Sequence, residues 1–333
     1  MMMTMFVHID CIMNDFIMHG DATALAAAIR SGRTCSEAAM QASLAAAAAM
    51  SPLGAIAYLD ASLGLSSARA LDEERLADPR RFALRPFGGV PTLAKDLGGP
   101  FAGLPVAAGS RLFDRQSNSA DSDLATRFRT AGLCPFGLTT SPEFGLSLAS
   151  EPAIGPLCRN PLDASRTAGG SSGGAAAGIV AIAHATDAGG SIRVPAACCG
   201  LVGLKPTRGA MPAGPTFGNL LGGIASELAV CRSVRDTVAL FAALSGTAQG
   251  PYADPVKSSF VSGPLRIGLL TDTGSDYPLD PARQAAIEDA GRFLESQGHA
   301  LMPLSWSAFA NAVATSGRVF GDIVSVNLAS LAD

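Results

Sequence analysis

Apolar and polar positions alternate with helical spacing at the start of the chain. Residues 21–30 predict one helix, which Gly32 closes. Thr34, followed three positions later by Glu37, forms a capping box, which predicts a second helix that reaches about residue 50. The first fifty residues are therefore expected to supply two helices in succession.

Shorter apolar runs predict strands further along the chain. The segments 87–96 and 133–138 have the length and apolar character of buried strands, and residues 122–131 predict a helix between them. Residues 179–186 predict another strand, which follows a short Ala-rich helix over residues 174–178. Strands separated by helices indicate an α/β fold, in which helices cover a sheet.

The last part of the chain repeats this alternation. Residues 265–270 predict a strand, residues 280–297 a helix and residues 300–304 the next strand. Strand, helix and strand at this spacing form a βαβ unit. Residues 308–331 predict a final helix.

Composition narrows the classes of function. The chain has 333 residues, of which 48% are hydrophobic and 16% charged, so it can bury a large core. Its net charge is -4 and the sequence has no basic cluster, so nucleic acid is not an expected partner. Residues 38–59 carry no charge, but their many alanines, with Gln41 and Pro52, favour a packed helix over a membrane span.

Seven scattered cysteines include no C-x-x-C pair, which favours reduced thiols in the cytoplasm over disulfides or a zinc site. The adjacent Cys198 and Cys199 are expected to pack in the core.

Residues 1–20 are rich in Met and lack the basic start and the cleavage site of a secretory signal. We therefore expect a disordered leader there.

Lysine is rare in this chain. Only three of the 24 basic residues are Lys, namely Lys95, Lys205 and Lys257. Arg cannot release its proton at a workable pH, whereas a buried Lys can. Lys95 ends an apolar strand, so it is either a neutral base or an ordinary lysine paired with a neighbour such as Asp96. The same two interpretations apply to Lys205.

Two serines, Ser171 and Ser191, each follow a Gly-Gly pair in a nearly uncharged window. Gly-Gly allows backbone conformations closed to other residues and leaves N–H groups free to face a substrate oxygen. A serine nucleophile needs a base, and the nearby His184 lies in a predicted strand, where packing is its more common role. The window thus favours a hydrolase with a Lys base, with two ordinary tight turns as the alternative.

Taken together, these segments resemble the amidase signature family over residues 21–333. The motifs that carry the resemblance are GVPTLAKD at 89–96, SPEFG at 141–145, RNP at 159–161, SRTAGGSSGG at 165–174, TDAGGSIR at 186–193 and GLKPTRG at 203–209. The variant AHATDAGGS is most similar to the branch of the 6-aminohexanoate-cyclic-dimer hydrolases.

The resemblance implies a mixed β-sheet covered by helices on both faces, and an amidase that hydrolyses the C–N bond of a small carboxylic amide through a serine acyl-enzyme. The family's triad maps onto Lys95, Ser171 and Ser191, with a cis peptide bond between Gly170 and Ser171. No metal or organic cofactor is implied. The oxyanion hole is expected at Ala188, Gly189 and Gly190, and the supporting positions at Ser172, Asp187 and Arg193. Lys205 matches a motif residue outside the triad.

Two features depart from the family pattern. Ser171 and Ser191 are 20 positions apart (191 − 171), about four fewer than is usual, or close to one helical turn. The chain is also short, so residues 21–333 are expected to form one amidase signature domain that is truncated at its C-terminus. The alternatives are a catalytically impaired amidase relative and an A-type subunit of a tRNA-dependent amidotransferase. A homodimer is left open.

A different hydrolase class also fits part of the window. Residues 169–173 match the G-x-S-x-G elbow of α/β-hydrolases. That elbow must follow a strand, and residues 163–168 are expected to be a loop, so the amidase interpretation is favoured.

Overall fold

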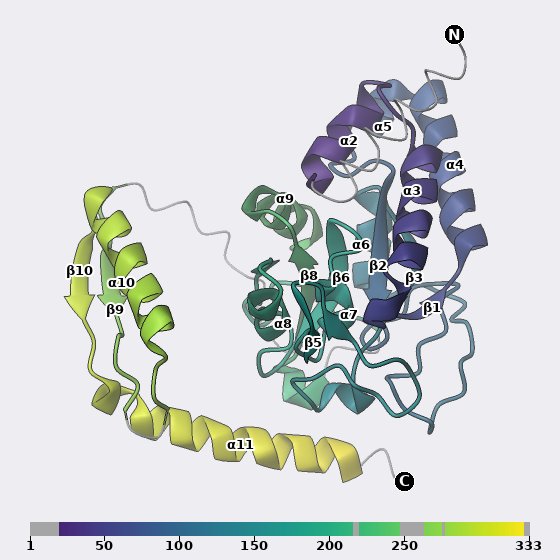
Figure 1. Cartoon of the computed structure of the whole chain (residues 1–333). Coiled ribbons are helices and arrows are strands. Elements are labelled where there is room, and N and C mark those ends of the chain that lie inside the picture. The colour runs from purple at the N-terminus through teal and green to yellow at the C-terminus, as the bar shows by residue number, and fades with distance from the viewer. Residues whose placement is uncertain (1–19, 216–219, 247–262, 275–276, 330–333) are drawn as a thin grey trace. The chain divides into compact units, whose positions relative to one another are not determined.

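The computed structural model describes residues 20–215, 220–246, 263–274 and 277–329 (Figure 1). The leader expected over residues 1–20 therefore lies almost wholly outside the described residues. The chain divides into two compact units, Met1–Pro255 and Val256–Asp333, so the single domain expected over residues 21–333 comprises two units.

A six-stranded sheet forms the centre of the first unit, with strand order β1-β3-β2-β6-β8-β7. Strand β2 runs parallel to β3 and to β6, while the other neighbouring pairs are antiparallel, so the predicted mixed sheet is confirmed. The strands are β1 Ile56–Leu59, β2 Val90–Lys95, β3 Leu133–Thr139, β6 Ile182–Asp187, β7 Val202–Gly203 and β8 Ser226–Cys231.

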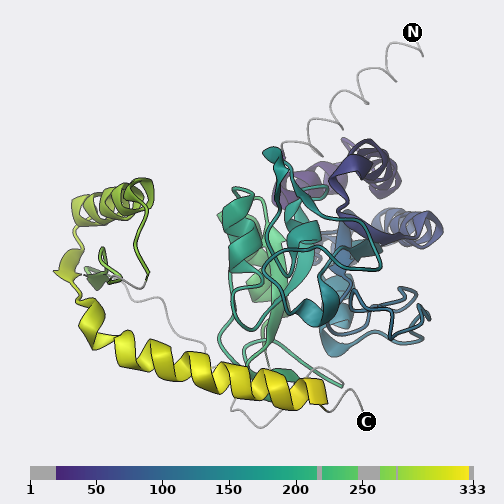
Figure 2. The ribbon, with the colours of Figure 1, turned by 60° about the horizontal axis from the view of Figure 1, so that its bottom comes forward.

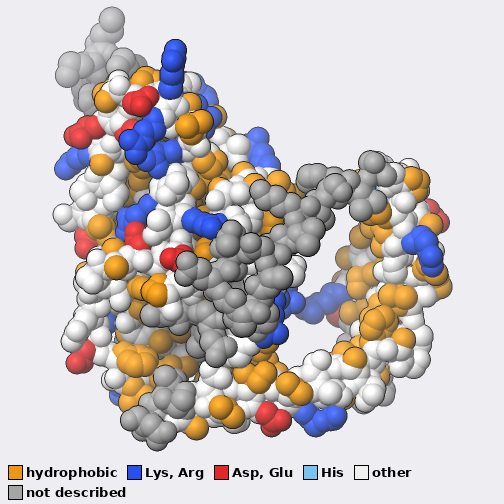
Figure 3. Space-filling model, turned by 180° about the vertical axis from the view of Figure 1, so that it is seen from behind, with side chains coloured by type: hydrophobic (Ala, Val, Ile, Leu, Met, Phe, Trp, Pro, Cys, Tyr) orange, Lys and Arg blue, Asp and Glu red, His pale blue; other side chains and the backbone are white. Residues whose placement is uncertain are grey.

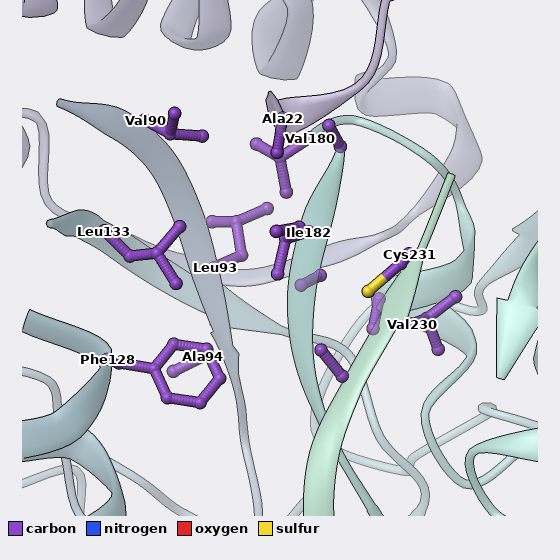
Figure 4. Packing of buried hydrophobic residues seen from close by; sticks show 14 of the residues in the cluster. Ala22, Val90, Leu93, Ala94, Phe128, Leu133, Val180, Ile182, Val230 and Cys231 are labelled. Carbon is purple, nitrogen blue, oxygen red and sulfur yellow. The ribbon is translucent and has the colours of Figure 1, made fainter. Parts of the chain in front are cut away.

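The four central strands are buried along their whole length. Every residue of β2, β3, β6 and β8 is buried. Because successive side chains of a strand point to opposite faces, both faces of this part of the sheet are covered. Figure 4 shows Leu93, Ile182 and Val230 in the resulting apolar core.

Helices cover this sheet. Helices α3 and α4 pack against β2 and β3, while α6 packs against β3 and α9 against β8. The helices of the first unit are α2 Ala22–Arg30, α3 Ser36–Ala49, α4 Ala61–Ala77, α5 Pro79–Ala83, α6 Asp123–Thr130, α7 Gly173–Ala176, α8 Arg193–Cys198 and α9 Val234–Leu244, with short 3-10 turns at Ser51–Leu53, Glu143–Gly145 and Leu220–Gly223.

Helix α2 is tied to α9 across most of the chain. Asp236, which is completely buried, accepts hydrogen bonds from the main-chain N–H groups of Ala22 and Thr23, each over 2.8 Å. Asp21, the N-cap of α2, forms an ion pair with Arg235. The first turn of α2 therefore takes its hydrogen-bond partners from a helix more than 200 residues later.

Helix α3 begins one residue later than the Thr34 capping box predicts. Its N-cap is Cys35. Asp72 of α4 accepts the N–H groups of Ser36 and Glu37 over 2.8 and 3.0 Å. A carboxylate from a neighbouring helix thus satisfies the donors of this first turn, and no capping box at the predicted register is needed.

The loop expected over residues 163–168 is wrong in part, because β5 Asp163–Thr167 pairs with β4 Arg159–Asn160 as an antiparallel hairpin. Two residues join the strands, which is the commonest hairpin connection. This hairpin is a separate two-stranded sheet. The Gly-rich window therefore still does not follow a strand of the central sheet, as the α/β-hydrolase elbow requires.

The described cysteines are free thiols. Cys199 is buried and its thiol donates to the Ala168 carbonyl over 3.4 Å, but Cys198 is exposed, so the expected core packing is wrong for Cys198. Cys198 ends a short helix, and its neighbour Cys199 takes the inward position. None of the described helices is long and apolar enough to cross a membrane.

The second unit contains the predicted βαβ arrangement. Strands β9 Arg266–Leu269 and β10 Ala300–Pro303 are parallel, and α10 Pro281–Ser296 connects them. The unit continues through a 3-10 turn, Trp306–Ala308, into α11 Ala310–Ala329, which Figure 2 shows as one long helix. Large apolar side chains of this unit are exposed, among them Phe293 and Val326. Figure 3 shows hydrophobic side chains on the surface of the molecule.

Candidate active site

Lys95 is the last residue of β2, and only 1% of it is exposed. Its Nζ donates to Ser171 Oγ over 2.7 Å and to Thr186 Oγ1 over 2.8 Å. Burial lowers the pKa of Lys95 to about 7, and the negative charges of Asp187 and Glu227 only partly oppose this effect. Near neutral pH, Lys95 can therefore both take and return a proton.

Ser171 precedes α7, and the Gly170–Ser171 peptide bond is cis, as the family resemblance implies. The backbone of residues 147–149 packs against it so closely that a Cβ on Gly170 would lie 2.6 Å from the Ser147 carbonyl oxygen. Ser150 completes the support, because its hydroxyl donates to the Ser171 carbonyl over 3.3 Å and accepts the Gly173 N–H over 2.9 Å. Only glycine fits at position 170.

Ser191 lies in the turn after β6, next to the other serine segment. Its carbonyl accepts the Ser172 N–H over 3.2 Å, and the Ser172 hydroxyl donates to the Thr186 carbonyl over 3.3 Å. Within the described part of the chain, the Ser191 hydroxyl forms no hydrogen bond with Ser171. The structure thus joins Lys95 and Ser171 directly, and it joins the main chain of Ser191 to Ser172, the residue after Ser171.

Asp187 organises the turn that carries Ser191. It is fully buried and accepts hydrogen bonds from the N–H groups of Gly190 and Ile192 over 2.7 and 3.0 Å, and from both ends of the Arg193 guanidinium over 2.9 Å. Burial alone would raise the pKa of Asp187, but the hydrogen bonds from Arg193 and from the turn hold it below its usual value. Asp187 therefore remains a carboxylate.

The three N–H groups expected to form the oxyanion hole differ in availability. The N–H of Gly190 already donates to Asp187, so it is not free for a substrate oxygen. Those of Ala188 and Gly189 donate to no acceptor among the described residues. Gly190 has a φ of 123°, which favours glycine and allows the chain to turn toward Ser191.

The short spacing between the two serines is absorbed by the helix between them. Helix α7 spans only Gly173–Ala176, and Gly178, with a φ of 76°, turns the chain toward β6. The Ser172–Ser191 main-chain bond closes the other side of this segment. The segment is therefore short without separating the two serines.

The other interpretations of the lysines are also resolved. Asp96 pairs with Arg115 over 2.8 Å and accepts the Ala107 N–H, so an ion pair between Lys95 and Asp96 is not formed. Lys205 donates to the Pro206 carbonyl over 2.7 Å and lies near Ser226. Lys205 therefore has different hydrogen-bond partners from Lys95, which bonds to Ser171 and Thr186.

Three residues beside Lys95 were given no catalytic role from the sequence, namely Thr186, His184 and Glu227. His184 is buried and packs against Phe101 and Phe128, so its interpretation as a packed strand residue is confirmed. No motif links Glu227 to Lys95, because only the register of β8 against β6 brings the two together. The described residues include no cluster of ligands that could hold a metal ion.

Comparison with known proteins identifies the family. The sequence model named Amidase matches residues 38–328, which is most of the chain. The chain is 36% identical to the 6-aminohexanoate-cyclic-dimer hydrolase of Paenarthrobacter ureafaciens over 84% of this chain and 58% of the relative. It is 38% identical to the putative amidase AmiC of Mycobacterium tuberculosis, with the same shares covered.

Solved structures agree with this assignment. A structure of 6-aminohexanoate cyclic dimer hydrolase matches with a TM-score of 0.75 and 33% identity, over 85% of this chain and 60% of the other. The native peptide amidase of Stenotrophomonas maltophilia matches with a TM-score of 0.74 and 28% identity, over 88% of this chain and 64% of the other. The chain therefore belongs to the amidase family and has the amidase signature fold. It spans 58% of the length of the first curated relatives it matches.

Proposed function

We propose that this protein hydrolyses the C–N bond of a small carboxylic amide through an acyl-enzyme on Ser191. The observation that carries the proposal is the buried 2.7 Å hydrogen bond between Lys95 Nζ and Ser171 Oγ, with a lysine whose pKa is about 7. A neutral lysine amine supplies the base that a serine nucleophile requires, and in the proposed triad the hydroxyl of Ser171 relays the proton between that base and Ser191.

Acylation begins when the Ser191 hydroxyl turns toward Ser171 and its oxygen attacks the amide carbon. Ser171 takes the proton of Ser191 while its own proton passes to neutral Lys95. The C–N bond then breaks, and the leaving nitrogen takes a proton back along the same path, so that Lys95 and Ser171 regain their starting states. The products of this half-reaction are the free amine and an ester on Ser191.

Deacylation repeats the path with water. Lys95, through Ser171, removes a proton from the attacking water, and the ester C–O bond breaks to release the carboxylic acid. The proton returns to Ser191. Each turnover consumes one water and leaves every residue unchanged, so the cycle needs no cofactor.

The oxyanion of each tetrahedral intermediate needs donors next to Ser191. We assign this role to the N–H groups of Ala188 and Gly189, which have no acceptor within the described chain, while Gly190 shapes the turn. Two preorganised donors of this kind are worth about 3–4 kcal/mol each in comparable hydrolases. Asp187 and Arg193 hold the turn in place.

An A-type amidotransferase subunit is the second candidate. Its basis is 34% identity to the A-type subunit of the glutamyl-tRNA(Gln) amidotransferase from Thermobifida fusca, over 92% of this chain and 64% of the relative. In that case the same serine would release ammonia from an amide donor for a partner enzyme. Glutamine is the substrate that separates the two functions.

The test is labelling of the purified chain with a serine-directed fluorophosphonate, followed by turnover of a panel of short amides that includes 6-aminohexanoate cyclic dimer and glutamine. We expect labelling that disappears in Ser191→Ala and persists in the matched variant Ser165→Ala, which alters a serine of the β5 hairpin. A folded chain that is not labelled, or is labelled equally in Ser191→Ala, would overturn the proposal.

A further inference from the structure

The side chains of Thr186, His184 and Glu227 gather on one face of the sheet behind Lys95. Thr186 lies directly opposite Glu227 in the antiparallel pairing of β6 and β8, so their side chains share a face at close range. His184 is two positions before Thr186 on the same strand and therefore points to that face as well. The Thr186 hydroxyl oxygen accepts a hydrogen bond from Lys95 Nζ over 2.8 Å.

His184 holds the main chain of Lys95. The N–H of Lys95 donates to His184 Nδ1 over 3.1 Å. Since a ring nitrogen that accepts a hydrogen bond carries no proton, the proton of His184 is on Nε2, which donates to Glu227 Oε1 over 3.0 Å. Strands β2 and β6 pair only at Leu93 and Ala183, so the Lys95 N–H lies outside the pairing of these two strands. The His184 ring accepts this N–H in place of a main-chain carbonyl.

Glu227 is enclosed on all sides. It is 2% exposed, and its Oε1 also accepts the Gly99 N–H over 2.9 Å. A Cβ on Gly98 would lie 2.4 Å from Glu227 Oε1 and 3.1 Å from His184 Cε1, so the chain passes directly over the two side chains. The second oxygen, Oε2, is buried and has no hydrogen-bond partner among the residues that the structure describes. Such an unpartnered buried oxygen lowers stability, which argues that Glu227 serves something other than stability.

From this geometry we propose that Glu227 and His184 are positioning residues of the Lys95 base: His184 fixes the main chain of Lys95, and the carboxylate of Glu227 supplies a buried negative charge that favours the ammonium form. This inference rests on the proposed function, in which Lys95 must accept a proton during each turn of the cycle. Without that charge, the protonated lysine would be harder to form in a buried site.

Two buried carboxylates, Asp187 and Glu227, favour the charged form of Lys95. Asp187 also pairs with Arg193, and Asp96, which follows Lys95, pairs with Arg115. The negative charge of Glu227 has no cation of its own among the described residues. The charged or titratable groups on the segments around Lys95 are Asp96 with Arg115, His184 and Asp187 of β6, Arg193 of α8, and Glu227 of β8.

The three lysines of the chain make a direct test practical. Protein labelled with ¹³C at the lysine ε-carbon gives at most three lysine signals, and the signal lost in Lys95→Met identifies Lys95. Its chemical shift is followed against pH in the wild type, in Glu227→Gln and in Glu73→Gln. Glu73 is exposed on α4 and is the matched removal of one negative charge.

We expect the titration midpoint of Lys95 to fall by about one pH unit in Glu227→Gln and to stay unchanged in Glu73→Gln. Glu227→Asp, which keeps the charge, should return the midpoint toward the wild-type value. Glu227→Met, whose side chain carries no hydrogen-bonding group that needs a partner, is the second variant if the amide does not fold. A midpoint that is unchanged in a folded neutral variant would overturn the inference.

A different result would count against the proposed function instead. If the wild-type Lys95 signal titrates near the ordinary lysine value of about 10.4, Lys95 is no base at neutral pH, whatever Glu227 does. In the wild type and in Glu227→Gln, the pH at which fluorophosphonate labelling of Ser191 reaches half its maximum should move together with the Lys95 midpoint. If the Lys95 midpoint shifts in Glu227→Gln but the pH dependence of labelling does not, Glu227 has no role in the reaction.

Discussion

Lys95 Nζ and Ser171 Oγ are 2.7 Å apart, and each of the two residues is 1% exposed. At this separation there is no room for water between them, so a proton can pass from one group to the other in a single step. A surface lysine would hold its proton at neutral pH, so the function proposed for this pair depends on its burial.

Replacing Lys95 by Met should abolish amide turnover while preserving the fold. We expect kcat/KM to fall by about 10³-fold or more, as is seen when one member of a serine hydrolase triad is removed. Lys205→Met is the matched control and should stay within about tenfold of the wild type. Turnover in Lys95→Met that equals the control would contradict the role of Lys95.

The pH dependence of labelling follows from the pKa of Lys95. That pKa is about 7, and only the neutral amine can act as a base, so the rate should rise with pH up to about 7 and then level off. The measurement is the rate of fluorophosphonate reaction with Ser191 at a series of pH values on both sides of neutrality. A rate that keeps rising toward pH 10 would indicate an ordinary lysine.

The sequence predicted the elements that hold this site because their patterns are local. The apolar run ending at Lys95, the Gly-Gly turns before Ser171 and Ser191, and the helix over residues 122–131 all carry their signal within a dozen residues. The rarity of lysine was informative for the same reason. It singled out Lys95 in a chain that otherwise uses Arg.

The contacts that the sequence did not predict depend on strand register and on side chains that accept backbone N–H groups. Glu227 reaches Lys95 only through the register of β8 against β6, and Asp72 caps α3 from a different helix. The Gly190 N–H was expected to be free, but Asp187, three residues earlier, folds back to accept it. For Asp72 and Asp187, a side chain accepts a backbone donor, which no periodicity reveals.

The buried Lys95 also makes a signed prediction for stability. The unfolded chain holds the lysine proton up to about pH 10.5, whereas the folded chain releases it above about pH 7. Between these values the unfolded state binds more protons, so raising the pH stabilises the wild type by up to about 1.4 kcal/mol per pH unit. Lys95→Met has no lysine proton to release, so its stability should lack this pH dependence. Urea unfolding of both proteins between pH 7.5 and about pH 9.5 should show the free energy of unfolding of the wild type rising relative to that of Lys95→Met.

Gly98 and Gly178 both have positive φ, and comparing their replacement by Ala separates the cost of backbone strain from the cost of a steric clash. A Cβ on Gly98 would lie 2.4 Å from Glu227 Oε1, whereas a Cβ on Gly178 would have no atom within 4 Å. Gly178→Ala should therefore cost only the backbone strain, about 1–2 kcal/mol. Gly98→Ala must also displace a buried side chain and should cost about 4 kcal/mol or more. Equal losses in urea unfolding would show that Glu227 is not packed as described.

Asp187 and Arg193 should differ in their contribution although they form one ion pair. Asp187 is fully buried and accepts several donors, while the Arg193 side chain is 52% exposed. Asp187→Asn leaves those donors without a carboxylate and should destabilise the chain by about 3 kcal/mol. Arg193→Met leaves the backbone donors of Asp187 in place and should cost about 1 kcal/mol or less. Thermal unfolding measures both, and a larger loss in Arg193→Met would reverse the assignment.

The bonds from Asp236 to the start of α2 set a lower limit on when this protein can finish folding during its synthesis. The 214 residues that separate Ala22 from Asp236 take roughly 10 to 40 s to make at common translation rates. Throughout that interval the N-terminal turn of α2 has no acceptor for its Ala22 and Thr23 N–H groups. Helix α2 is thus synthesised long before the residue that holds its first turn in its final place.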